Sequence, residues 1–384
     1  MLRLLLVVFT IQSGFHGFTG ALPVALAEGG LGSTEIGLVV GAASLVLIIA
    51  APIAGILLDR AGSFRMLTLG GGSYIAGALI LAANPVSSDA PLWPWLVARS
   101  LQGIGFAVVI PSALTLVPRI VPDARRGFWL TFTLLSQNLT LAIMPAISLA
   151  ILRATSLAGV ALVIATMAAI GTLLIRSLPR PADGVLAATH PDARRRFGLA
   201  YRSSWTAPLV VSLFAVAYWG LVLAHLPPRA ELAGTSSGVY FIGYGVSVVI
   251  TRLPAGWLSD RHSARLLVLV GLAISLVSTA LLVPEPTLPL LAASGALSGL
   301  ASGLVMSPLL LELSRRSSAA DRGSAFAMFA VATGGANALG SIGAAPIIEV
   351  AGFPAALGAG MGAVGLAGAM ILADRSFRTN RRSR

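Results

Sequence analysis

The stretch Gly55-Ile-Leu-Leu-Asp-Arg-Ala-Gly-Ser-Phe-Arg65 occurs a second time, 201 residues later, as Gly256-Trp-Leu-Ser-Asp-Arg-His-Ser-Ala-Arg265. Each copy lies in a short charged gap between two long apolar segments. A charged loop that recurs between apolar segments indicates that the chain contains two copies of one membrane-embedded unit. The second copy is the weaker one, because Ser263 stands where the first copy has Gly62.

The composition predicts a protein whose main solvent is lipid. The chain has 384 residues, of which 56% are hydrophobic and 10% are charged, and its mean hydropathy is +0.89. Soluble domains carry roughly 25% charged residues, so this chain has too few charges to cover a water-facing surface. It contains no cysteine, which excludes disulfides, thiolate metal sites and cysteine nucleophiles.

Twelve segments of the chain are long and apolar enough to cross a bilayer, which needs about 20 residues each. Strands of a membrane barrel would be shorter and would alternate in polarity, and these segments do neither. We therefore expect an all-α integral membrane protein with twelve transmembrane helices. The expected spans are 4–26, 35–58, 66–83, 92–117, 128–150, 156–175, 207–228, 237–258, 266–283, 288–310, 324–348 and 354–373.

The arginines predict the orientation of these spans. All 26 basic residues are arginine, and 22 of them fall near the N-terminus, in the loops after even-numbered spans or in the C-terminal tail. Loops rich in arginine stay in the cytoplasm, so we expect a multi-pass protein of the cell membrane with both termini cytoplasmic. The net charge of +12 is then a topology signal. We expect membrane lipids, and no nucleic acid, as its partners.

Two further repeats support an internal duplication. Arg126-Gly127 recurs as Arg322-Gly323 at an offset of 196, and Leu22-Pro23 recurs as Leu226-Pro227 at an offset of 204. The longest polar stretch separates six spans from six. We therefore expect two pseudo-symmetric six-helix bundles, which cover residues 1–178 and 206–384 and are joined by a cytoplasmic linker at 179–205. Duplicated halves of this kind place a substrate site between them, near the middle of the membrane.

The repeated loop, together with twelve spans, resembles the signature of the major facilitator superfamily, and the resemblance covers the whole chain. It implies that the loop acts as a conformational latch between the second and eleventh spans. Gly55 would allow these spans to approach closely, and Asp59 would face the positive N-terminus of span 11. Loop carboxylates or lipid phosphates would pair with the loop arginines. The latch residues would be Gly55, Asp59, Arg60, Gly62 and Arg65, with Gly256, Asp260 and Arg261 in the second copy.

A second motif in span 4, Arg99-Ser-Leu-Gln102-Gly-Ile-Gly-Phe-Ala107, resembles the Arg-x-x-Gln-Gly-x-Gly-x-Ala pattern of proton-coupled members of the superfamily. Arg99 would lie about 10 Å inside the membrane, where an arginine needs a partner or water. Alternatively, it snorkels to the outer interface. The third motif, typical of drug:proton antiporters, keeps only Pro145 clearly. The resemblance is greatest to the drug:proton antiporter-like efflux group.

Proton coupling has few candidate groups, because none of the 14 acidic residues falls in the middle of a span. His16, about 12 residues into span 1, titrates near physiological pH. Gln12 shares its helix face, and Arg99 could be its neighbour. The alternative is a neutral histidine that is hydrogen-bonded inside the bundle.

Other polar and aromatic residues within spans are candidates for a substrate cavity. Arg99 and Arg252 would attract an anion, although Arg252 could instead reach the headgroups. Aromatic side chains in a cavity favour apolar or cationic ligands. The further candidates are Gln102, Asn138, Tyr218, Trp219, Tyr240, Tyr244 and Asn337.

These observations favour a secondary active transporter that moves a small, partly apolar molecule out of the cell by alternating access, coupled to protons. The alternative is an importer or facilitator of a small polar or anionic solute, which Arg99 and the absence of a mid-membrane carboxylate favour. No nucleophile–base or metal-ligand constellation appears, so we expect neither an enzyme nor a cofactor or metal. We expect the chain to act as a monomer.

Overall fold

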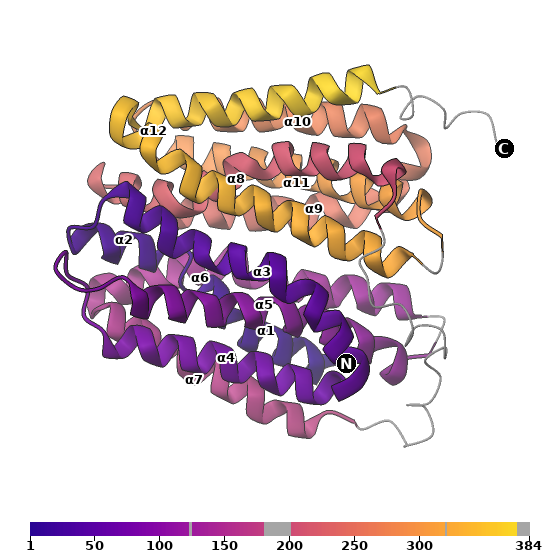
Figure 1. The fold of residues 1–384 in the computed structure, drawn as a ribbon, viewed down its shortest axis with the longest axis horizontal. Helices are drawn as coiled ribbons and strands as arrows, with labels where there is room; N and C mark the ends of the chain where they lie inside the picture. Colours follow the sequence, from indigo (N-terminus) through magenta and orange to yellow (C-terminus); the bar gives the residue numbers. More distant parts are fainter. Residues whose placement is uncertain (123–124, 180–200, 319–320, 375–384) are drawn as a thin grey trace.

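The computed structural model describes residues 1–122, 125–179, 201–318 and 321–374, and within these ranges the regular structure is helical (Figure 1). The first half contains α1 (Leu2–His16), α2 (Ala21–Glu28), α3 (Ser33–Ala61), α4 (Ser63–Ala83), α5 (Trp93–Ile120), α6 (Arg126–Ala154), α7 (Leu157–Leu174) and the short η2 (Ile175–Ser177). The second half contains η5 (Ser203–Trp205), α8 (Thr206–Leu232), α9 (Gly238–Arg261), α10 (Ala264–Ala280), α11 (Leu288–Arg315) and α12 (Arg322–Ala373).

The first predicted span is interrupted. It consists of α1 and α2, and the break between them includes two glycines. A side chain at Gly17 would meet Ile164 at 2.5 Å, and one at Gly20 would meet the Pro145 carbonyl at 2.9 Å. The break therefore lies close against α6 and α7. It leaves His16 at the end of a helix.

The last two predicted spans form one helix by hydrogen bonding, α12, which has 52 residues. A straight helix of this length would extend roughly 78 Å, more than twice the ~30 Å hydrocarbon layer. Gly352 has φ 81° and ψ 167°, and there the chain reverses, so that α12 crosses twice as two arms, 322–351 and 353–373 (Figure 1). Pro354 follows two residues later, so a glycine and a proline both favour a reversal at this point.

The prediction of an all-α membrane fold is confirmed. Nine of the described helices are long and apolar enough to cross a membrane, with α1 and α2 taken together, and two shorter apolar helices lie at Gly238–Arg252 and Ala264–Ala280. The described residues thus contain eleven apolar helical segments instead of the predicted twelve, with α1 and α2 counted as one, because the last two spans merge. The number of crossings is unchanged, since α12 reverses at Gly352.

The helices lie in two groups in chain order, α1–α7 and α8–α12 (Figure 1). Small residues allow close crossings inside each group. A side chain at Gly103 would meet the backbone of Ala43, and one at Gly295 would meet the backbone of Tyr240. Large side chains such as Trp95 and Trp205 fill the remaining space and are fully buried.

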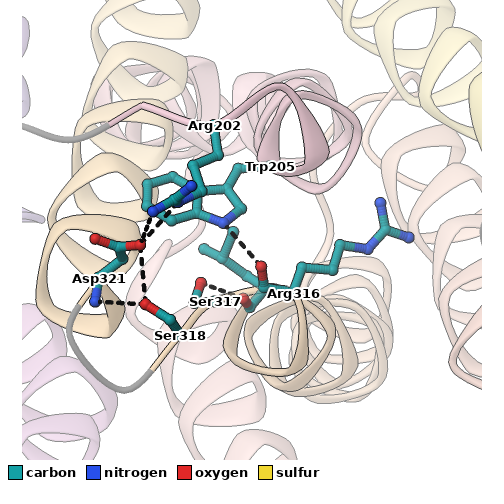
Figure 2. A network of polar contacts seen from close by, with 7 residues as sticks. Arg202, Trp205, Arg316, Ser317, Ser318 and Asp321 are labelled. Atoms are coloured by element: carbon teal, nitrogen blue, oxygen red, sulfur yellow. Dashed lines mark hydrogen bonds and ion pairs between the residues drawn. The ribbon is translucent and has the colours of Figure 1, made fainter.

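The end of the predicted linker is attached to the second group. Residues 180–200 lie outside the described residues, so the linker itself stays a prediction. Arg202 donates from Nε to Asp321 Oδ2 at 2.7 Å, and Trp205 Nε1 donates to the Arg316 carbonyl at 3.3 Å (Figure 2). Ser318 also donates to Asp321, at 2.9 Å. This linker anchor joins the start of α8 to the loop between α11 and α12.

Candidate functional site

A cavity of about 590 Å³ lies between the two groups of helices and has walls from both. Eight residues that sequence analysis selected line it: His16, Arg99, Asn138, Tyr218, Trp219, Tyr244, Arg252 and Asn337. Gln12, Gln102 and Tyr240 are fully buried and lie outside the lining. The cavity thus lies between the two halves, where the sequence predicts a substrate site. Gln12, Gln102 and Tyr240 do not line it.

Arg99 is the main charged group on the first wall. It is 5% exposed, and it donates from Nη1 to Gln102 Oε1 at 2.5 Å and from Nη2 to the Val40 carbonyl at 3.4 Å. Its guanidinium lies over the Phe15 ring, 5.1 Å from the centroid. Within the described part of the chain it forms no ion pair with a carboxylate. The snorkelling alternative is wrong, because Arg99 is buried beside the cavity.

His16 lies on the same wall as Arg99. The Phe106 ring contacts it edge-on, with the centroids 6.1 Å apart. Both ring nitrogens are buried, and neither has a hydrogen-bond partner among the described residues. The alternative of a hydrogen-bonded structural histidine is therefore not supported. An unpaired imidazole at a cavity is available to a proton, to water or to a solute.

Gln12 lies one helical turn from His16, but it does not form a hydrogen bond with that ring. It accepts a hydrogen bond from the Tyr74 hydroxyl at 2.7 Å, and both side chains are fully buried. Sequence analysis did not select Tyr74. The sequence contains a feature that could have identified it: Tyr74 is a lone tyrosine in the middle of span 3. A hydroxyl there needs a partner, because lipid offers none.

The second wall carries aromatic rings and hydroxyls. Trp219 and Tyr244 are stacked, with centroids 4.2 Å apart and planes at 28°. Tyr218 and Ser298 share a hydrogen bond of 2.9 Å, and the Tyr244 hydroxyl donates to Ser302 at 3.1 Å. Sequence analysis missed these serines, which lie one helical turn apart on α11. The sequence feature that could have identified them is their position directly before Gly299 and Gly303, on the tightly packed face of that helix.

The cavity is electropositive and contains apolar surface. Arg99 and Arg252 line it, whereas the lining includes no aspartate or glutamate. The described residues also contain no group of three or more histidine or acidic side chains that could hold a metal ion. The lining therefore offers positive charge and apolar surface to a bound solute.

The signature loop shows one expected feature and lacks another. Gly62 has φ 79° and separates α3 from α4, a backbone conformation that favours glycine. Ser263, at the matching position of the second copy, has φ −66°, which explains why that copy needs no glycine. Gly55 is exposed and has no atom within 4 Å of where its side chain would begin, so the close approach expected at Gly55 is not made here.

The other latch residues receive no structural test. The side chains of Asp59 and Asp260, and the surroundings of Gly256, lie outside the described residues. Arg60 and Arg261 are in the last turns of α3 and α9, and Arg65 is exposed near the start of α4. Their roles in a latch stay predictions.

At the opposite end, which carries Glu28 and is called here the Glu28 end, the two halves touch. A side chain at Gly37 of α3 would clash with the Ser341 carbonyl of α12. The backbone N–H of Thr34 donates to Glu349 at 3.0 Å. Arg153 of α6 pairs with Glu231 of α8 at 2.6 Å. Because these contacts join the halves, the cavity is closed at the Glu28 end.

The chain belongs to the Major Facilitator Superfamily, which residues 4–249 and 229–383 match. It is accordingly a multi-pass membrane transporter rather than an enzyme. Among solved structures, it is similar to a mutant of the peptide transporter POT at 16% identity and TM-score 0.78, covering 97% of this chain and 93% of that one. It is similar to the nucleoside transporter NupG at 15% identity and TM-score 0.76, covering 98% of both chains.

A third similar structure is a D-xylose–proton symporter, at 17% identity and TM-score 0.73, covering 97% of this chain and 95% of that one. At these identities the likeness is one of fold. None of the three is named as a drug:proton antiporter. The resemblance to that group, and the efflux direction that it implies, are not supported by these similarities.

Proposed function

We propose that the chain transports a small organic anion with a planar or apolar body by alternating access. The observation that carries this proposal is the composition of the cavity lining: two arginines, no carboxylate, and the stacked pair Trp219–Tyr244. Arginine binds planar anions through several donors at once. The aromatic pair offers a flat apolar surface to the rest of the solute.

Three probes of similar size test the charge preference: benzenesulfonate, benzamide and benzyltrimethylammonium. We expect purified protein to bind the sulfonate most tightly in titration calorimetry. Arg99→Gln removes charged hydrogen bonds worth about 1.5–3 kcal/mol, so sulfonate binding weakens roughly 10- to 100-fold. Arg176→Gln is the matched control, because Arg176 is exposed at the end of η2.

The same measurement distinguishes the second candidate, an exporter of a neutral, partly apolar molecule. The aromatic pair and the apolar part of the cavity lining favour it. If benzamide binds as tightly as benzenesulfonate, and Arg99→Gln weakens both equally, the anion proposal is wrong and the neutral one is favoured. The direction of transport is then measured by comparing right-side-out and inside-out vesicles.

Proton coupling through His16 is the third part of the proposal. His16 lines the cavity and neither of its ring nitrogens has a hydrogen-bond partner among the described residues, so it is our candidate to bind and release a proton when the cavity changes shape. In proteoliposomes with an imposed pH gradient, His16→Ala should still equilibrate labelled benzenesulfonate but should not accumulate it. His262→Ala, at an exposed loop position, is the control. Uphill accumulation by His16→Ala would exclude His16 as the sole carrier.

A further inference from the structure

We infer that Asn138 and Asn337 form a two-point clamp for one neutral group of the transported solute, a group that both donates and accepts hydrogen bonds, such as a carboxamide. The inference rests on the proposed function and names a second determinant of specificity. One asparagine comes from each half of the protein, on α6 and on the first arm of α12.

The two asparagines lie at nearly equivalent places in the internal repeat. Their offset is 199 residues. This falls between the offset of 196 for Arg126 and Arg322, at the starts of the two helices, and the offset of 201 for Pro145 and Pro346, further along them. The duplication thus places one amide on each of two equivalent helices.

Both side chains belong to residues of the cavity lining, and each has one amide atom without a partner among the described residues. The two atoms are Nδ2 of Asn138 and Oδ1 of Asn337, and both are buried. Buried polar groups in native proteins are nearly always hydrogen-bonded. A solute group in the cavity would supply the missing partners.

The amides differ in this respect from the hydroxyls beside them. The hydroxyls of Tyr218 and Tyr244 are already bonded to serines of α11, so they offer less to a ligand. An amide supplies two donors and an acceptor oxygen. Rotation about χ2 exchanges which of these faces the solute. A pair of amides is therefore matched to a group that itself both donates and accepts.

The position of Asn337 is fixed by the backbone. Gly220 has no side chain, and a Cβ there would clash with the Asn337 carbonyl, so α12 lies directly against α8 at this point. Gly220 follows Trp219, which places the amide beside the aromatic wall. Asn138 belongs to the opposite half. A solute group that bonds both amides therefore connects the halves.

The test adds a carboxamide to the anionic probe. We compare 4-carbamoylbenzenesulfonate with benzenesulfonate by titration calorimetry on the purified full-length chain. The variants are Asn138→Ala, Asn337→Ala and the double variant, with Asn138→Gln as a conservative substitution that retains the amide. Asn84→Ala is the matched control, since Asn84 bonds the Ile80 carbonyl away from the cavity. Melting temperatures identify any variant that does not fold.

We expect the carboxamide to improve binding by about tenfold or more in the unmodified chain. Each alanine variant should reduce this gain to about twofold, where the gain is the ratio of the two affinities measured in the same variant. The double variant should lose no more than either single variant, because both amides bind one group. Asn138→Gln should recover part of the gain.

The inference is overturned if the carboxamide gives no gain in the unmodified chain, if the alanine variants keep the gain, or if their losses add independently. Failure of the proposed function is a different result: benzenesulfonate then binds no more tightly than benzamide. In that case, benzamide binding that still depends on both asparagines supports the clamp, and benzamide binding indifferent to them overturns it.

Discussion

The two ends of the helix bundle differ in how the halves meet. At the Glu28 end, α3 lies against α12 so closely that Gly37 has no room for a side chain, and an ion pair joins Arg153 to Glu231. At the other end, called here the signature-loop end because Arg60 and Arg261 lie there, Gly55 of the same α3 has open space around it. Helix α3 thus lies against α12 of the second half at Gly37, whereas no such contact is made at Gly55.

This difference indicates one state of an alternating-access cycle. The cavity lining reaches Thr131 and Leu310, each within two turns of the helix ends at Arg126 and Arg315. The cavity therefore extends toward the signature-loop end and is closed at the Glu28 end. If the transporter alternates, the contacts of the Glu28 end must break and a contact at Gly55 must form.

The largest expected effect comes from blocking closure at the Glu28 end. Gly37→Val places atoms against the backbone of Ser341, which cannot move aside, so the halves cannot meet there. We expect transport of benzenesulfonate to fall by about 100-fold or more. Gly343→Val, on α12 with nothing within 4 Å, should leave transport unchanged.

The change of state can be measured directly, because the chain has no cysteine of its own. Thr19→Cys provides a single reporter on the cavity lining. In the unmodified background, an impermeant maleimide should label it from one side of the membrane only. With Gly37→Val, it should label from the opposite side. Unchanged sidedness of labelling would contradict the assignment of the Glu28 end as the closed gate.

The second prediction concerns the latch at the signature-loop end. Asp59→Asn removes the charge that would face a helix N-terminus when this end closes, an interaction worth up to ~2 kcal/mol. We expect transport in proteoliposomes to slow about tenfold with normal membrane insertion. Asp89→Asn, in an exposed loop, is the control. Unchanged transport by Asp59→Asn would contradict the predicted role of Asp59 in a latch.

Sequence analysis predicted those features that lipid imposes on any chain. The twelve crossings follow from apolar segments, since a span has no other solvent for its side chains. The position of Gly62 also follows, because the corner between α3 and α4 needs a positive φ. These constraints are local. They can therefore be recognised from a single stretch of residues.

The remaining features depend on contacts between distant segments or on the state of the protein. Gln12 bonds Tyr74 of another helix, a pairing that no local pattern specifies. The contact that the sequence predicts at Gly55 is not made in this conformation, and an alternating-access cycle would form it only in another state. The merging of the last two spans at Gly352 depends on the geometry of a single corner.

A smaller effect is expected from the ion pair at the Glu28 end. Arg153 is 53% exposed and Glu231 20%, and an exposed pair contributes about 0.2–1 kcal/mol. Arg153→Gln should therefore shift the ratio of the two states only about two- to fivefold toward opening at the Glu28 end. Labelling of the Thr19→Cys reporter measures this. Adding Glu231→Gln should cause no further shift, whereas an additive shift would show that the two residues act separately.

The smallest effect on the balance of states is expected from the linker anchor, because its residues lie at the end of the predicted linker and in the second half, and none lies in the first half (Figure 2). Arg202→Gln removes the ion pair to Asp321, whose side chain is 4% exposed, so the melting temperature should fall by a few degrees. Labelling of Thr19→Cys should keep its sidedness, since no contact between the halves is lost. A shift as large as that of Arg153→Gln would mean that the anchor transmits the state of the linker to the gate. The difference between the closed Glu28 end and the open signature-loop end would then depend on the linker anchor as well as on the contacts made at each end.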